Sequence, residues 1–324
     1  LENAMRFQRP VSVRPLEDGS YFVVGYANNI IYRFDINGRI QSTIRGGLEG
    51  FNHPFDIIQV DDGQYFVSEF RGDRIAQCNS RGDKVGTFGE EGIGDGALLG
   101  PQYLAADGKG YIYVSDFGNR RVSKFDLDGN FVLSFGKADG TYPGFLSPSG
   151  IVVDNDMVYV ADTERGHIAV FDESGNYLSR LGEAALQAPE GLSLLPNGNI
   201  LVSDKKRLVS LSIENDSIKV LSDFEGRARN IMMSVPDVNG NILSVDFDAN
   251  SVFILSELAS MLGGFHIQIR HIDSTDFPSL RLDVTVEDNY GNPVVGLTES
   301  NFLINEQDSR QFRIVEDFNL NFIG

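Results

Sequence analysis

The 324-residue sequence contains no tryptophan, four histidines and a single cysteine, Cys78. One thiol excludes an internal disulfide framework and leaves the redox compartment undefined. No apolar run approaches the roughly 20 residues that span a bilayer, and no signal peptide is visible. We therefore expect no membrane insertion. Cys78 occupies a repeat position where other copies carry phenylalanine, which predicts a buried apolar filler rather than a nucleophile.

Positive charge is also scarce. The chain has 27 Lys and Arg against 46 Asp and Glu, a formal net charge of −19. Such a chain repels phosphate backbones, so nucleic-acid binding would need a strong local basic patch. The best cluster, Lys205-Lys206-Arg207, is three residues on one turn. We therefore expect a solvated acidic surface and no nucleic-acid partner.

What the chain has in abundance is short alternating segments separated by Gly, Asn and Asp. Residues 101–136 contain four such segments, a pattern typical of antiparallel strands joined by tight turns. The predicted strands are Tyr103–Ala106, Tyr111–Asp116, Arg121–Asp126 and Asn130–Phe135. A single four-stranded sheet of this kind cannot bury both of its faces, so it needs similar neighbours.

The second strand of this unit recurs six times, with a period of about 41–47 residues that is typical of propellers and other repeat arrays. The copies are Tyr21–Tyr26, Tyr65–Phe70, Tyr111–Phe117, Met157–Thr163, Asn199–Lys205 and Asn241–Phe247. Proline opens the first strand of five copies, where a missing ladder donor is tolerated, and Ile231 replaces it in the sixth. The sequence therefore predicts an all-β fold with six blades.

The segment Pro148–Gly175 contains P-x-G-I-x-V-D, V-Y-V-A-D-T and I-x-V-F-D-x-x-G in register. This pattern resembles the NHL repeat, and VSDFGNRRVSKFDLDG (residues 114–129) matches it best. The resemblance covers roughly residues 10–257 and implies a six-bladed β-propeller, a fold that hosts lyases, lactonases, receptors and scaffolds alike. It is specific for fold and weak for function. Copies five and six are assigned more by periodicity than by motif.

The repeat pattern divides the chain into a propeller at residues 1–264 and a small β-strand module, without the repeat, at residues 265–324. Because the chain starts at a first strand, ring closure is expected from the C-terminal end. Residues 256–264 suggest a helical turn. The alternating segment Phe265–His271 either supplies the missing outer strand of blade six or opens the next module, and we favour the second.

The stretch of about 45 residues that begins at Phe277 carries a second resemblance. Leu282-Asp283-Val284, Asp288, Gly291, Pro293-Val294 and Gly296-Leu297 resemble the β-sandwich segment that precedes von Willebrand factor A-type domains in bacterial extracytoplasmic proteins. Strands are expected at Leu280–Glu287, Leu303–Glu306 and Gln311–Glu316. The resemblance implies a longer bacterial parent protein, periplasmic or on the cell surface. The metal motif D-x-S-x-S of that domain does not occur in the sequence.

The residues that carry metal or proton chemistry are few. His53, Glu190 and Asn230 are placed where they could face the axis, which keeps a metal-dependent lyase or lactonase at the central channel as the alternative function. Recurrent acids such as Asp116, Asp162 and Asp204 fit turn capping and blade-to-blade ion pairing better than a catalytic ring. No catalytic residue, resident metal or cofactor is assigned.

Function is therefore predicted from the loops that gather at one rim of the propeller. Aromatic and arginine side chains among polar loops are typical of protein-binding hot spots. The predicted binding residues are Phe55, Arg71, Tyr103, Phe117, Arg120, Arg165, Glu190, Lys205 and Phe247. These residues favour a non-catalytic platform that binds a protein, or a glycan, within a larger protein.

Overall fold

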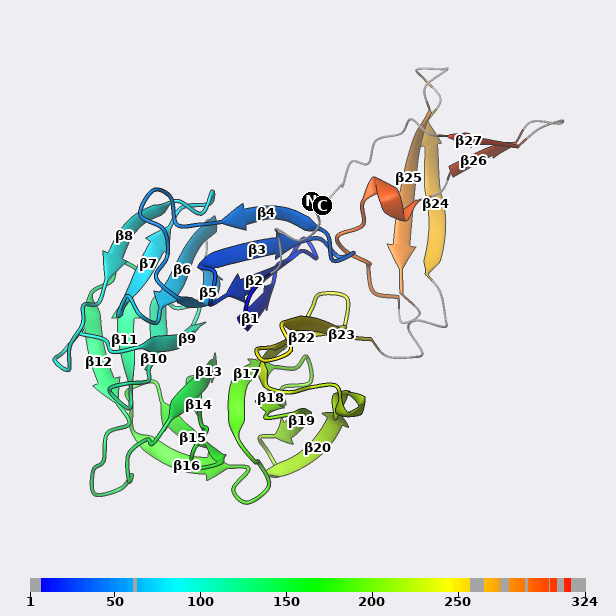
Figure 1. Ribbon diagram of the computed structural model, residues 1–324. Coiled ribbons are helices and arrows are strands. Elements are labelled where there is room, and N and C mark those ends of the chain that lie inside the picture. The colour runs from blue at the N-terminus through cyan, green and yellow to red at the C-terminus, as the bar shows by residue number, and fades with distance from the viewer. Residues whose placement is uncertain are drawn as a thin grey trace.

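The computed structural model describes residues 7–60, 63–256, 265–273, 275, 280–288, 291–302, 304–307 and 312–315. Six antiparallel sheets stand around a common axis like the blades of a propeller (Figure 1). The first strands of neighbouring blades pack against one another, and β1 of blade 1 packs against β21 of blade 6. The predicted six-bladed β-propeller is thus confirmed.

Blades 1 to 5 each have four strands in sequence order from the axis outward. Blade 1 is β1 (Pro10–Pro15), β2 (Tyr21–Gly25), β3 (Ile30–Phe34) and β4 (Ile40–Ile44), and blade 2 is β5 (Pro54–Val60), β6 (Gln64–Glu69), β7 (Arg74–Cys78) and β8 (Lys84–Phe88). Blade 3 is β9 (Pro101–Ala106), β10 (Tyr111–Asp116), β11 (Arg121–Asp126) and β12 (Phe131–Phe135). Blade 4 is β13 (Pro148–Asp154), β14 (Met157–Asp162), β15 (His167–Asp172) and β16 (Tyr177–Leu181), and blade 5 is β17 (Pro189–Leu194), β18 (Ile200–Asp204), β19 (Arg207–Ser212) and β20 (Ser217–Ser222).

Blade 6 has three strands in the described part of the chain, β21 (Ile231–Pro236), β22 (Ile242–Asp246) and β23 (Ser251–Leu255). A short 3-10 turn, Phe224–Gly226, precedes it. Of the two predictions for residues 265–271, the structure shows the second, because β24 (His266–Asp273) pairs with β25 (Arg281–Glu287) rather than with β23. The helical turn expected at residues 256–264 falls almost entirely outside the described residues.

Turn chemistry explains where the strands of each blade end. Asp126 and Asp172 close third strands, and each carboxylate accepts a hydrogen bond from the backbone N–H four residues on, at 2.8 and 2.9 Å. Gly129 follows Asp126 with φ +87°, a left-handed conformation that favours glycine.

Cys78 is fully buried in blade 2, and burial raises the pKa of its thiol to about 12. The predicted role of Cys78 as an apolar filler is therefore confirmed.

The C-terminal residues form two hairpins, β24–β25 and β26–β27 (Ile304–Gln307 and Phe312–Val315), with a 3-10 turn at Glu299–Asn301. The β24–β25 hairpin projects away from the ring (Figure 1). Its apolar side chains, among them Ile267, Ile269 and Ile272, are exposed. No helix in the described residues is both long and apolar enough to span a membrane.

A segment of the C-terminal module docks across the junction between blades 1 and 6. Asn239, in the first turn of blade 6, donates to the carbonyl of Val295 at 3.1 Å and accepts from its N–H at 2.9 Å. Asn37 of blade 1 and Asn301 exchange two side-chain hydrogen bonds, at 3.3 and 3.0 Å. Residues 295–301 therefore link the first and last blades without adding a strand to either sheet.

Candidate binding face at the mouth of the propeller

We call mouth face the end of the ring formed by the loops between second and third strands and by the loops that enter each first strand. Six aromatic residues from four neighbouring blades, 6, 1, 2 and 3, gather there. This mouth cluster consists of Tyr26, Phe55, Phe70, Tyr103, Phe117 and Phe247. Tyr26 contacts three of them, with ring centroids 6.2 Å from Phe55, 6.0 Å from Phe70 and 6.2 Å from Phe247. Phe70 continues the cluster to Phe117 at 6.4 Å.

The mouth cluster has a buried floor and an accessible wall. Phe55 is 5% exposed and Tyr103 is 0% exposed, with ring centroids 5.1 Å apart. The prediction that these two residues offer a binding surface at the rim is therefore corrected: their side chains point toward the axis and form the floor. Tyr26, Phe70, Phe117 and Phe247 are partly exposed and form the wall.

Tyr103 crosses the axis of the propeller. Its hydroxyl donates a 2.8 Å hydrogen bond to the carbonyl of Met232, which lies in blade 6, opposite blade 3 in the ring. Burial raises the pKa of the Tyr103 phenol well above its ordinary value. The phenol is therefore uncharged, and its hydrogen bond connects opposite blades beneath the mouth.

An ion pair between the partly buried Arg14 and the fully buried Asp56 joins blades 1, 2 and 3 near the same axis. The Asp56 carboxylate accepts hydrogen bonds from the Ser12 hydroxyl at 2.5 Å, from Arg14 Nε at 3.0 Å and from the Leu104 N–H at 3.0 Å. Arg14 also forms an ion pair with Asp56 through Nη2 and donates to the Leu104 carbonyl at 2.9 Å. Sequence reasoning missed this pair. The available signal was an acid, Asp56, between apolar residues in the first half of a first strand.

The mouth is polar on the side of blades 4 and 5. Glu190, at the start of β17, is surrounded by protein on most sides yet remains partly accessible to solvent. Its carboxylate accepts a 3.1 Å hydrogen bond from the Thr163 hydroxyl, which also contacts the Ser149 hydroxyl at 2.8 Å and the Pro189 carbonyl at 2.7 Å. Burial raises the pKa of Glu190 to about 7, against the smaller opposing effect of the Thr163 hydrogen bond.

This raised pKa predicts how stability depends on pH. Because the folded-state pKa of Glu190, about 7, lies above the ordinary 4.5, the folded state holds more protons between these values. The contribution of Glu190 is therefore fully present below pH 4.5 and is lost as the pH rises through about 7. Glu190→Gln should remove this loss and stabilise the protein above neutral pH by about 1 kcal/mol, since partial exposure reduces the full effect. Urea unfolding of both proteins at acidic and alkaline pH measures this difference in the free energy of unfolding. The assignment would be refuted if the free energy of unfolding changed with pH equally in the wild type and the variant.

The remaining predicted binding residues divide into exposed and structural side chains. Arg71, Arg120 and Lys205 are exposed, each in a loop between second and third strands. Arg165 is partly buried, donates to the Gly144 carbonyl at 3.1 Å and pairs with Asp162 at 3.3 Å. The structure therefore gives Arg165 structural contacts within its own blade and with the loop that enters it.

The residues of the metal alternative have separate partners. His53 Nδ1 contacts the Asn52 amide oxygen at 3.1 Å, and burial together with the nearby Arg71 charge lowers its pKa. The Asn230 N–H donates to Asp246 at 3.2 Å, whereas Glu190 contacts Thr163. Within the described residues, no group of three or more His, Cys, Asp or Glu side chains is arranged to hold a metal ion.

The recurrent acids at the ends of second strands cap the loops that enter their own blades. Asp116 accepts from the Leu99 N–H at 2.8 Å and from Arg121 Nε at 2.8 Å. Asp204 accepts from two backbone N–H groups, at 2.8 and 2.7 Å, and pairs with Arg207. The predicted capping is confirmed. The ion pairs shown by these two acids lie within a blade, however, because the arginine opens the third strand beside the acid.

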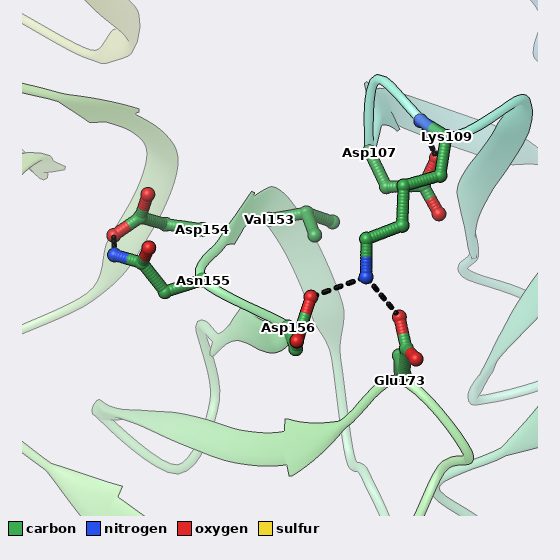
Figure 2. Close-up of a pocket in the computed structure, with 7 residues that line it drawn as sticks. All are labelled: Asp107, Lys109, Val153, Asp154, Asn155, Asp156 and Glu173. Carbon is green, nitrogen blue, oxygen red and sulfur yellow. Dashed lines mark hydrogen bonds and ion pairs between the residues drawn. The ribbon is translucent and has the colours of Figure 1, made fainter.

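The opposite face carries an acidic pocket of about 300 Å³ between blades 3 and 4 (Figure 2). Its lining consists of Asp107, Lys109, Val153, Asp154, Asn155, Asp156 and Glu173. Lys109 extends between two acids of blade 4, forming ion pairs with Asp156 and, at 3.0 Å, with Glu173 (Figure 2). The three side chains are exposed, so this link between blades contributes little to stability.

Comparisons with known proteins agree with this architecture. Residues 145–171 match the NHL repeat. A 46-residue stretch is 50% identical to Protein lin-41 of Caenorhabditis elegans, covering 14% of this chain and 4% of that protein. A 122-residue stretch is 25% identical to Protein brain tumor of Drosophila melanogaster, covering 37% of this chain and 12% of that protein. The chain thus spans only a small part of the curated relatives that it matches.

Solved structures similar to this chain are propellers of differing function. A catalytically inactive virginiamycin B lyase from Staphylococcus aureus, crystallised with quinupristin, aligns with a TM-score of 0.58 and 16% identity over 78% of this chain and 81% of that one. A chain of a nidogen/laminin complex aligns with a TM-score of 0.54 and 16% identity over 71% and 90%. These similarities establish the fold: the protein is a six-bladed β-propeller that contains an NHL repeat.

Proposed function

We propose that this propeller is a non-catalytic platform that binds a protein partner at its mouth face. One observation carries the proposal. The axis beneath the mouth is occupied by Tyr103, while an aromatic wall and the exposed Arg71 and Arg120 stand around it. Rigid aromatic and arginine side chains beside buried neighbours are typical of interface hot spots.

The setting of this platform is a second part of the same proposal. The exposed apolar face of the β24–β25 hairpin is consistent with residues 265–324 being a partial β-sandwich module of a larger protein. Its resemblance to segments that precede von Willebrand factor A-type domains supports a bacterial, extracytoplasmic parent. Glycan is the second class of partner, because aromatic wall residues also suit sugar rings.

Removal of the exposed arginines tests the proposal. Arg71→Ala with Arg120→Ala should lower capture of the partner at least tenfold, because each truncated hot-spot side chain costs about 1–2 kcal/mol of binding. Quantitative mass spectrometry of proteins retained from extracts of the source cell by wild-type and variant propeller measures the change. Both side chains are exposed, so the unfolding temperature should stay the same.

A matched control lies at the other end of blade 3. Lys109 precedes β10, whereas Arg120 follows it, so the two side chains are on opposite faces of the ring. Lys109→Ala should retain the same proteins as the wild type. Equal retention by the arginine variant and the wild type would overturn the proposal.

A further inference from the structure

The third strand of blade 6 is uncovered, whereas the third strands of the other blades are buried. Val252, the second residue of β23, is partly exposed. The residues at the same position in blades 1 to 5 are all 0% exposed, namely Ile31, Ile75, Val122, Ile168 and Leu208. Phe253 and Leu255 of β23 are also partly exposed, and Ile254 is 49% exposed. The described part of the chain therefore leaves an apolar strand open on the outside of blade 6.

A fourth strand covers the third strand in each of blades 1 to 5. In blade 6, no strand of the described residues pairs with the outer edge of β23 (Figure 1). The next strand, β24, follows after residues 256–265 and pairs with β25, whereas four or five residues connect third and fourth strands in the other blades. An open strand edge presents unpaired N–H and C=O groups, which are a template for pairing with another strand.

The neighbouring blade 1 leaves room for the end of such a strand. In blades 2, 3 and 4, the glycine of the turn between third and fourth strands lies against the last residue of the preceding blade's fourth strand. A Cβ added to Gly129 of blade 3 would lie 2.7 Å from the Phe88 ring of blade 2. The same relation joins Gly175 with Phe135 and Gly82 with Ile44.

The equivalent glycine of blade 1 is Gly38, and the space beside it is open. Apart from its chain neighbours, the only described atom within 4 Å of an added Cβ is the Tyr21 hydroxyl oxygen, at 3.7 Å. Blade 6 precedes blade 1 in the ring, so this is the place that the last residue of a fourth strand of blade 6 would take. The open edge and the open space beside Gly38 thus belong to one site.

The fourth strands of the other blades define the segment that fits this site. In blade 1, Ile40 lies opposite Phe34 and Ile44 lies opposite Ile31. Blade 3 repeats the pattern with Phe131 and Phe135. The last residue of the strand is buried, at 8% exposure for Ile44, while the three residues before it are exposed. The matching segment is an extended strand with large apolar residues at its first and fifth positions.

We infer that the outer edge of β23 accepts an extended segment of a protein partner as the fourth strand of blade 6. The segment pairs antiparallel with β23, as every other fourth strand does with its third strand. Its first apolar residue lies opposite Leu255, and its fifth lies opposite Val252 and enters the space beside Gly38. The described strands of this chain already belong to other sheets, so another protein supplies the segment. This second binding site goes beyond the mouth face and does not depend on it.

Hydrogen–deuterium exchange of the full chain tests whether the edge is free. The probe is acetyl-Arg-Ile-Gln-Ser-Thr-Ile-Arg-amide, which repeats residues 39–45 and therefore the fourth strand of blade 1. We expect the outward-facing amides of residues 251–255 to exchange about tenfold faster than those of residues 207–212, the third strand of blade 5, and the probe to remove this difference. Equally slow exchange of both segments without the probe would mean that this chain or a second copy already covers the edge, which would overturn the inference.

Disulfide trapping tests the register of the bound strand. Ile254 corresponds to Arg33 of blade 1, which pairs with Ser42, the third residue of β4. Ile254→Cys should therefore form a mixed disulfide with acetyl-Arg-Ile-Gln-Cys-Thr-Ile-Arg-amide. A peptide with its cysteine one position earlier should react about tenfold more slowly, because that side chain points to the other face of the sheet. Cys78 is buried and does not compete.

Two controls make the trapping specific for blade 6. Val132→Cys places a thiol on the exposed outer strand of blade 3, which has all four strands, and should trap about tenfold less of the peptide. Replacing the last isoleucine of the peptide with asparagine should lower trapping by Ile254→Cys about tenfold, because the apolar contact beside Gly38 is lost. Equal trapping by both proteins, or by both peptides, would overturn the inference. Neither variant lies at the mouth, so such a failure would leave the platform proposal standing.

Discussion

Replacing Asp56 with alanine is expected to lower the free energy of unfolding by about 3–5 kcal/mol. The side chain is fully buried and accepts hydrogen bonds from blades 1, 2 and 3, including those from Ser12, Arg14 and Leu104. Its removal leaves the enclosed Arg14 guanidinium without a counter-charge and the Leu104 N–H without an acceptor. Urea unfolding followed by far-ultraviolet circular dichroism measures the loss.

An exposed ion pair of the neighbouring blade 1 provides the control for Asp56. Asp18 pairs with Arg33 at the surface, and its side chain is more than half exposed. Asp18→Ala should cost no more than about 1 kcal/mol. A loss below about 1 kcal/mol for Asp56→Ala as well would contradict the assignment of Asp56 as the link between three blades.

Replacing Gly150 with alanine is expected to destabilise the fold by about 3 kcal/mol. Gly150 lies in β13, where the first strand of blade 4 packs against that of blade 5. An added Cβ would lie 2.6 Å from the backbone nitrogen of Leu192 and closer still to the carbonyl oxygen of Glu190. Because both atoms belong to a neighbouring backbone, only a shift of a whole strand relieves the overlap.

Gly140 provides the matched control for this substitution. It lies in the exposed loop between blades 4 and 3, and an added Cβ would meet no atom within 4 Å. Gly140→Ala should leave the thermal unfolding midpoint unchanged or slightly raised, since alanine restricts the unfolded chain. If both variants had the same thermal unfolding midpoint as the wild type, the close packing of blade 4 against blade 5 at Gly150 would be wrong.

The fold was predictable because its information is local and repeated. Each blade carries its own alternation and turn residues, so six imperfect copies identify six sheets even where the motif has changed, as at Lys205-Lys206-Arg207. The predicted strand Arg121–Asp126 agrees with the structure residue for residue. In the C-terminal module, predicted strands such as Leu280–Glu287 begin or end one residue away from those observed.

The mouth was only partly predictable, because its chemistry depends on contacts across the ring. Glu190 was placed correctly at the head of a first strand, but its hydrogen bond to the Thr163 hydroxyl of the neighbouring blade emerges only from the completed ring. Tyr103 lies in a first strand that is buried from Pro101 to Ala105, yet the sequence cannot tell that its hydroxyl reaches Met232 in the opposite blade. Pairings over such distances have no local signature.

The same limit explains the missed ion pair and the missed docking segment. Arg14 and Asp56 are separated by 42 positions in the chain, and no motif joins them. Asn239 and Val295 are separated by 56 positions and meet because the C-terminal segment folds back onto blade 6. Side-chain complementarity of this kind follows from the completed ring rather than from the repeat.

The position of the binding surface can be tested directly by photo-crosslinking in the source cell. A photoreactive amino acid is placed at Arg120 on the mouth face or at Lys109 on the opposite face, at the two ends of β10. We predict a crosslinked partner from position 120, lost when Arg71→Ala is added, and none from position 109. Crosslinks from position 109 alone, or equal crosslinks from both positions, would contradict a binding platform at the mouth.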